Sequence, residues 1–95
     1  MLKEPLAIDR ATALIHAIAR TGDMGWTQHA NDERAADNLT TVDCVNVLRA
    51  GAVKDPPELT RGTWRYCVHT NRICVVVAFR SESELVVVTT WRKKR

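Results

Sequence analysis

Apolar residues recur at helical spacing in the first fifth of the chain. Five of them fall at i, i+4, i+7, i+8 and i+11: Ala7, Ala11, Leu14, Ile15 and Ile18. Polar residues line the opposite side of the same segment. This pattern predicts an amphipathic helix from about Pro5 to Arg20, with one buried stripe. Thr21–Gly22 supply a helix end.

The next segment, HANDERAADNLT, is far more polar. Only four of its twelve residues are apolar, and three of those are alanines. We expect a short second helix from about Thr27 to Asp37, with Trp26 as its one large anchor. Asn38 follows directly and is suited to the left-handed conformation that stops a helix.

A third helix is predicted after Thr40. Thr40 followed three residues later by Asp43 is typical of a capping box, and Gly51 lies just past the last apolar position. The connector KDPPEL comes next. Its paired prolines disfavour both a helix and an interior strand.

From Thr63 onward the pattern indicates strands. TWRYCVH, RICVVVAF and LVVVTTW are rich in β-branched and aromatic residues, and Thr70–Asn71 and Ser81–Ser83 are natural turns between them. We therefore expect one α+β domain over residues 1–95. Two or three N-terminal helices would pack on one face of a three- to four-stranded antiparallel sheet.

Strand alternation predicts which side chains share a face. A two-residue turn at Thr70–Asn71 pairs His69 with Arg72 and Cys67 with Cys74, and Arg80 then pairs with Glu84. The face expected against the helices carries Trp64, Tyr66, Val68, Ile73, Val75, Val77, Phe79, Leu85, Val87, Thr89 and Trp91. The other face carries Arg65, Cys67, His69, Arg72, Cys74, Val76, Ala78, Val86, Val88, Thr90 and Arg92.

The basic end of that second face is a candidate phosphate site. It brings together the predicted neighbours Arg65, His69, Arg72, Thr90 and Arg92. Guanidinium groups bind phosphate oxygens with paired hydrogen bonds, and a histidine can transfer a proton near neutral pH. Such a group can hold an RNA phosphate and assist attack by the neighbouring 2′-hydroxyl. The alternative is a solvent-exposed sheet face, on which arginines are common because they keep the strand edges soluble.

A second candidate lies on the polar helix. Trp26, His29, Ala30 and Glu33 share one side at helical spacing, so His29 and Glu33 can touch. A histidine oriented by a carboxylate suits a general base. The alternative is an exposed helix in which His29 only packs on Trp26 or caps a backbone group.

Composition argues against a metal-binding, disulfide-rich, secreted or membrane protein. The net charge is +3, and the three cysteines show no CxxC spacing. We therefore expect no metal site, no cofactor and no disulfide framework, with Cys67 and Cys74 acting as small hydrophobic residues. With no signal peptide or membrane span in the sequence, a reducing cytoplasm is the expected location.

Three stretches of the chain together resemble a bacterial family of uncharacterised small proteins. They are HANDERAADNLTTVDCVNVLRAG, GTWRYCVHTNRICVVVAF and ELVVVTTW, and they span roughly Trp26 to Trp91. That family looks related to the RelE- and BrnT-like toxins of type II toxin–antitoxin systems. This sequence departs from the family pattern at three positions. Where the family has arginines four and eight residues after the histidine, this chain has Glu33 and Asp37. Where the family has a glycine, this chain has Asn38.

The resemblance implies a toxin-like, metal-independent endoribonuclease acting on free or ribosome-bound mRNA. Its expected partner is a cognate antitoxin, with RNA as substrate and no membrane contact. We assign His29, Arg65 and His69 to catalysis, and Arg72, Thr90 and Arg92 to RNA binding. A noncatalytic protein- or RNA-binding module would use the same basic face. A homodimer formed through Val76, Val86 and Val88 is a third hypothesis.

Overall fold

The computed structural model describes residues 2–93 as three helices and six strands. The elements in chain order are α1 (Ile8–Thr21), β1 (Asp23–Trp26), α2 (Gln28–Ala36), α3 (Thr41–Ala50), β2 (Ala52–Val53), β3 (Glu58–Thr60), β4 (Thr63–His69), β5 (Ile73–Ser81) and β6 (Glu84–Arg92). The predicted α+β class is confirmed. Within residues 2–93, no helix is both long and apolar enough to cross a membrane.

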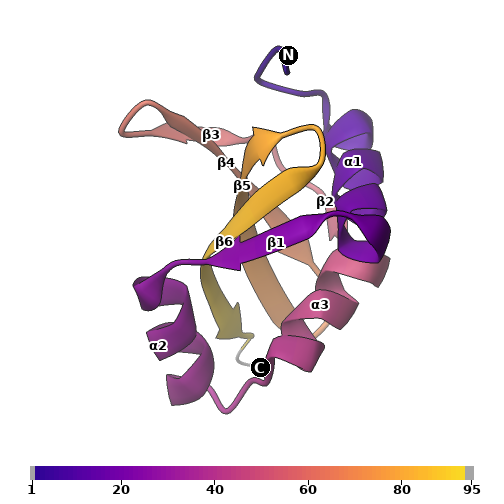
Figure 1. The fold of residues 1–95 in the computed structure, drawn as a ribbon. Coiled ribbons are helices and arrows are strands. Elements are labelled where there is room, and N and C mark those ends of the chain that lie inside the picture. The colour runs from indigo at the N-terminus through magenta and orange to yellow at the C-terminus, as the bar shows by residue number, and fades with distance from the viewer. Residues whose placement is uncertain (1, 94–95) are drawn as a thin grey trace.

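Helices α1 and α3 cover one face of the sheet (Figure 1). The buried stripe of α1 contributes Ala11, Ile15 and Ile18, as its periodicity predicts, but Ala7 is an exposed N-cap residue and the helix begins at Ile8 instead of near Pro5. Helix α3 adds Cys44, Val47 and Leu48 to the same core. The sheet meets them with alternate side chains of β4, β5 and β6: Tyr66, Val68, Val75, Val77, Leu85 and Val87. These apolar side chains, removed from water between two layers, hold the domain together.

The sheet is larger than predicted and partly parallel. Its main strand order is β1-β6-β5-β4-β2, and β3 pairs with β4 off this path. Strand β1 runs parallel to β6, with Asp23 opposite Glu84 and Trp26 opposite Val87. The prediction of three or four antiparallel strands is therefore wrong. The strands that sequence reasoning missed have at most four residues each, too few to display a clear alternation.

The predicted helix ends are confirmed at two places. Asn38 has φ of 60°, the left-handed conformation expected after α2. At the start of α3, the Thr40 hydroxyl accepts from the Asp43 amide, and the Asp43 carboxylate accepts from the Thr40 amide. The pKa of Asp43 is lowered, because the bond from the Thr40 amide and, after it, the nearby Thr40 hydroxyl favour the charged carboxylate.

The β4–β5 hairpin has a different register from the predicted one. His69 lies opposite Cys74, and Cys67 lies opposite Val76. The predicted partners, His69 with Arg72 and Cys67 with Cys74, are wrong. Because the partner moves by two positions, every side chain on these two strands stays on its predicted face.

A bulge in β6 reverses the faces beyond it. Val76 pairs with Thr89, but Val77 pairs with Val87, which leaves Val88 as an extra residue in β6. Thr90 consequently faces the core, where it is fully buried. Its hydroxyl donates to the Cys74 carbonyl at 2.8 Å. The face predicted for Thr89, Thr90 and Trp91 from simple alternation is therefore wrong.

Helix α2 lies alongside β6, beyond the point where β1 ends (Figure 1). Thr27 makes the connection. Its amide donates to the Val87 carbonyl at 3.1 Å, and its hydroxyl donates to the Val88 carbonyl at 3.0 Å. The same hydroxyl accepts from the Ala30 amide, as an N-cap residue does. The start of α2 is thus bound to the bulge.

We expect Thr90→Val to destabilise the fold by about 1–2 kcal/mol, because valine keeps the volume but leaves the buried Cys74 carbonyl without this donor. Urea denaturation monitored by circular dichroism measures the difference. A valine variant as stable as the original chain would contradict an inward-facing Thr90 hydroxyl.

Tyr66 supplies a test at alkaline pH, because it is the sole tyrosine of the chain. Its ring is fully buried, and its hydroxyl accepts from the Leu6 amide and donates to the Glu4 carboxylate. Burial raises the pKa of Tyr66 from 10.0 to about 12. In the unfolded chain the phenol ionises at its ordinary pKa. Stability should therefore be retained below pH 10 and fall as the pH rises from 10 to 12.

An absorbance titration of phenolate formation measures this pKa in the folded protein. Tyr66→Phe should remove the titration signal and its share of the pH dependence. A folded-state midpoint near 10 would contradict the buried, hydrogen-bonded phenol.

Candidate functional site

A cleft of about 380 Å³ lies on the sheet face opposite α1 and α3. Its walls come from the connector before β3 and from strands β3 to β6. The chemically relevant lining residues are Asp55, Glu58, Arg65, Cys67, His69 and Trp91. Arg65, Cys67 and His69 alternate along β4 with the core residues Tyr66 and Val68, so one strand supplies both the core and the cleft.

Two nitrogen atoms in this cleft have no hydrogen-bond partner among residues 2–93. The Nε atom of Arg65 and the Nε2 atom of His69 are both buried, and neither makes a hydrogen bond within the described part of the chain. An unmatched buried donor is costly in a folded protein, so such groups often mark a ligand position. Both predicted residues therefore lie in one cleft, as the faces of β4 imply.

His69 lies between a thiol and a carboxylate. Its Nδ1 atom is 3.0 Å from the Cys74 sulfur, and its Nε2 atom is 3.7 Å from an Asp55 oxygen. Burial lowers the pKa of His69, and the nearby positive charge of Lys93 lowers it further. The imidazole is therefore mainly neutral at pH 7, a form that can accept a proton or bind a metal ion.

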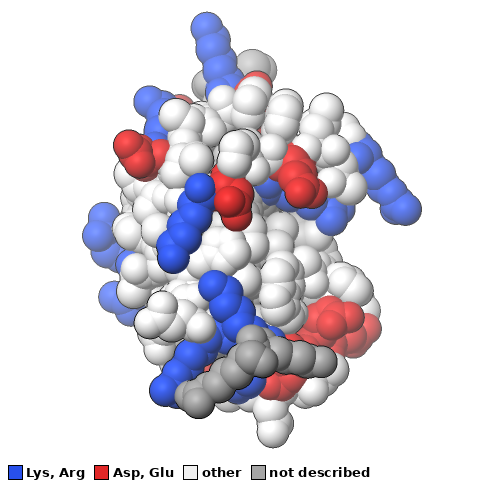
Figure 2. All heavy atoms as spheres, turned by 180° about the vertical axis from the view of Figure 1, so that it is seen from behind, with Lys and Arg blue, Asp and Glu red and all other residues white. Residues whose placement is uncertain are grey.

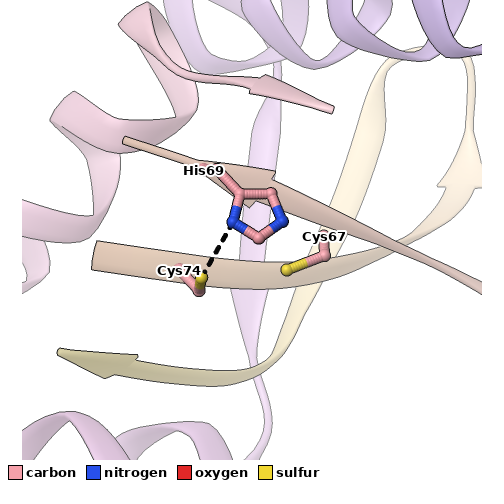
Figure 3. Close-up of side chains that lie close together, drawn as sticks. All are labelled: Cys67, His69 and Cys74. Carbon is pink, nitrogen blue, oxygen red and sulfur yellow. Dashed lines mark hydrogen bonds between the residues drawn. The ribbon is translucent and has the colours of Figure 1, made fainter. Parts of the chain in front are cut away.

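Two cysteines lie against this imidazole. Figure 3 shows the His69 ring between the sulfur atoms of Cys67 and Cys74. Ligand atoms of the three side chains all lie within 4.8 Å of one another. Burial raises the pKa of Cys67 to about 12, and the neighbouring Cys74 thiol raises it too. Both thiols are free, and Cys74 is buried.

The cleft carries both signs of charge. Glu58 lies directly opposite Arg65 in the β3–β4 pair, and Asp55 approaches His69 from the connector. The Asp55 side chain is 77% exposed, so it lies at the rim. Figure 2, the view from behind, likewise shows cationic and anionic side chains interspersed. The predicted concentration of cations is not present in the cleft.

Arg72 does not join Arg65 and His69. It lies at the exposed tip of the β4–β5 hairpin, in the segment between His69 and Ile73. There it borders a separate hollow against α3, next to Asp43. Its predicted place on the cleft wall depended on the two-residue turn, which the observed register replaces.

Thr90 and Arg92 are also outside the cleft, because the Val88 bulge turns them to the other side. Thr90 is buried in the core. The Arg92 guanidinium donates to the main-chain carbonyls of Asp37 and Asn38, at the end of α2. Their predicted place beside Arg65 is therefore wrong. Thr89 and Trp91 take the positions on the cleft wall instead.

His29 is remote from this cleft. It makes the predicted contact with Glu33, at 3.9 Å, but its side chain is 64% exposed. No residue of α2 lines the cleft. The apolar patch predicted from Val76, Val86 and Val88 is also incomplete, since Val86 is buried. Strand alternation predicts Cys67, His69 and Cys74 on one face, but it predicts no metal role, because the cysteine spacing matches no common zinc motif.

The comparisons with known proteins give one result. A family model described as a domain of unknown function, DUF4258, matches residues 26–92. The chain belongs to this family. No curated protein and no solved structure matches the chain. The matched segment begins at the end of β1 and contains every residue that lines the cleft.

Proposed function

We propose that the chain is a toxin-like, metal-independent endoribonuclease whose active site is the Arg65–His69 cleft. The observation that carries this proposal is the pair of buried, unpartnered nitrogens on these two side chains. A phosphodiester oxygen would satisfy the Arg65 donor, and a ribose hydroxyl would satisfy the His69 nitrogen. Arginine is well suited to a phosphate because its N–H donors are fixed in a plane.

The proposed reaction is transfer of the phosphate to the adjacent 2′-oxygen. His69 Nε2 takes the proton of the 2′-hydroxyl, and the 2′-oxygen attacks phosphorus. The bond from phosphorus to the 5′-oxygen breaks, and that oxygen takes a proton from solvent. Arg65 stabilises the charge that develops on the phosphate oxygens. The products are a 2′,3′-cyclic phosphate and a 5′-hydroxyl end.

The surroundings of the cleft suit a nucleic-acid substrate. Trp91 is 39% exposed at its wall and presents an aromatic surface on which a base can stack. Thr89 adds a hydroxyl on the same strand. The proposal places the protein in the cytoplasm, with mRNA as substrate and a cognate antitoxin covering this face.

A noncatalytic binding module is the second candidate, and the two carboxylates favour it. Asp55 and Glu58 repel a phosphate backbone, whereas a mixed rim suits a protein partner with complementary charges. In this alternative Arg65 would pair with a carboxylate of the partner. The two candidates differ in whether the purified chain breaks RNA.

Cleavage of RNA by the purified chain tests the proposal. Arg65→Lys should reduce the rate roughly 10²- to 10³-fold, because lysine lacks the planar donors. His69→Gln should reduce the rate roughly 10²- to 10⁴-fold, because glutamine cannot transfer the proton. Arg49→Ala is a matched control, since it removes an exposed charge on α3 and leaves the cleft intact.

The substrate supplies a second control. RNA with a 2′-deoxyribose at the cleaved position should resist the enzyme, because the attacking oxygen is absent. Added EDTA should leave the rate undiminished. Cleavage that survives His69→Gln, or that yields 5′-phosphate ends, would contradict the mechanism.

Expression in a bacterial host separates the two candidates. We expect the original chain to arrest growth, and the double variant Arg65→Ala/His69→Ala to restore it at equal protein level. Western blotting verifies the level, and circular dichroism of the purified variant verifies its fold. Normal growth with the original chain would favour the binding module.

A further inference from the structure

The strands β4 and β5 bring three metal-binding side chains to one spot. Cys67 and His69 are alternate residues of β4, so they share a face, and Cys74 lies directly opposite His69 on β5. Their ligand atoms lie within 4.8 Å of one another, with the Cys74 sulfur 3.0 Å from His69 Nδ1. We propose that Cys67, His69 and Cys74 bind one thiophilic divalent metal ion, with zinc as the best chemical match.

The observed spacing is close to that of a zinc site. Tetrahedral zinc, with bonds of about 2.3 Å to sulfur and 2.0 Å to nitrogen, separates these ligand atoms by roughly 3.5–3.8 Å. The Cys74 sulfur and His69 Nδ1 need to move apart slightly, and the wider pairs need to close by at most about 1.3 Å. Figure 3 shows the three side chains close together on the neighbouring strands β4 and β5, so the proposed adjustments are rotations of side chains and not shifts of the strands.

Charge balance favours the same ion. Two thiolates beside each other in a buried site would repel, and burial keeps the pKa of Cys67 high in the metal-free protein. A divalent cation bound by two thiolates and a neutral imidazole forms a group of zero net charge. Its formation releases the two thiol protons to solvent, so binding strengthens as the proton concentration falls.

Two of the three proposed ligands, Cys67 and His69, line the cleft. Zinc with two cysteines and one histidine keeps a coordination position for water or a small ligand. With the ion on Nδ1, the Nε2–H group of His69 points to Asp55, whose oxygen lies 3.7 Å away. A carboxylate behind a metal-bound histidine fixes the ring orientation and strengthens binding.

Metal binding has a consequence for the proposed reaction, and this step rests on the proposed function. An ion on Nδ1 of His69 places the ring proton on Nε2, so Nε2 can no longer take the 2′-hydroxyl proton. The metal would therefore inhibit RNA cleavage, and a chelator would restore it. Zinc bound by the three side chains would act as an inhibitor of the proposed active site.

Cobalt(II) titration of the full reduced chain tests the metal site directly. Co²⁺ replaces zinc with similar ligands and reports thiolate binding by charge-transfer and d–d absorption bands. We expect tetrahedral bands that saturate at one Co²⁺ per chain and disappear when Zn²⁺ is added. Cys67→Ser and Cys74→Ser should each abolish the thiolate pattern of the original chain, with circular dichroism verifying the fold.

Three further variants test the assignment of the ligands and of their carboxylate neighbour. Cys44→Ser should keep the bands, because Cys44 is the remaining cysteine and lies in the core next to Thr90. His69→Cys should also keep tetrahedral bands, since a third thiolate can replace the imidazole. Asp55→Asn should weaken Co²⁺ binding by about 10- to 100-fold.

Three outcomes would overturn the metal proposal: absence of thiolate bands, bands that persist in Cys67→Ser, or bands that disappear in Cys44→Ser alone. This readout needs no RNA, so it stands apart from the proposed function. If the bands form and zinc leaves an active enzyme uninhibited, the metal site stands and the inhibitory role is wrong. If the bands form and no cleavage occurs, the ribonuclease proposal fails alone.

Discussion

The extra residue Val88 in β6 is the constraint on which the arrangement of both layers depends. It shifts the strand by one position, so that Thr90 enters the core and Trp91 turns to the cleft. At this bulge the carbonyls of Val87 and Val88 accept from the amide and the hydroxyl of Thr27. Since Thr27 is the N-cap of α2, the bulge positions that helix as well. One irregularity thus sets the cleft wall, the core layer and the polar helix.

The bulge changes the electrostatics of the candidate site, because it removes Arg92 from the cleft wall. Regular alternation would have placed Arg92 beside Arg65 and His69, in a strongly basic cluster. The observed cleft has one guanidinium, one neutral imidazole and two carboxylates. Long-range attraction of a polyanion is weak under these conditions. A phosphate ligand would depend on short-range bonds to the two unpartnered nitrogens, whose strength increases in a partly desolvated cleft.

The parts of the fold predicted well from sequence are those with a long, regular signal. The stripe of α1, the capping box at Thr40, the left-handed Asn38 and the face of each residue in β4 all agree with the structure. Each depends on local periodicity or on the chemistry of one turn. Alternation along β4 likewise predicts that Arg65 and His69 lie on one face, and both line the cleft.

The remaining features depend on contacts between distant segments. Strand β1 is defined by its parallel pairing with β6, which lies about sixty residues away in the sequence. The Val88 bulge has no local signature, because VVV fits a regular strand equally well. Alternation does place Cys67, His69 and Cys74 on one face, but their spacing resembles no common zinc motif, so the sequence gives no signal for a metal site. Strict alternation assigns side chains to the wrong face of the sheet beyond any point where a strand carries one additional residue.

The polar composition of α2 follows from its position. The helix lies along β6 where β1 has ended, so it covers a strand edge that would otherwise expose unpaired backbone groups. One buried contact is enough for this role, and Ala30 supplies it with no exposed surface. A larger residue at this position would meet the packed core. His29 points to solvent and contacts Glu33. In the His29–Ala30 pair, it is therefore the alanine that packs against the core.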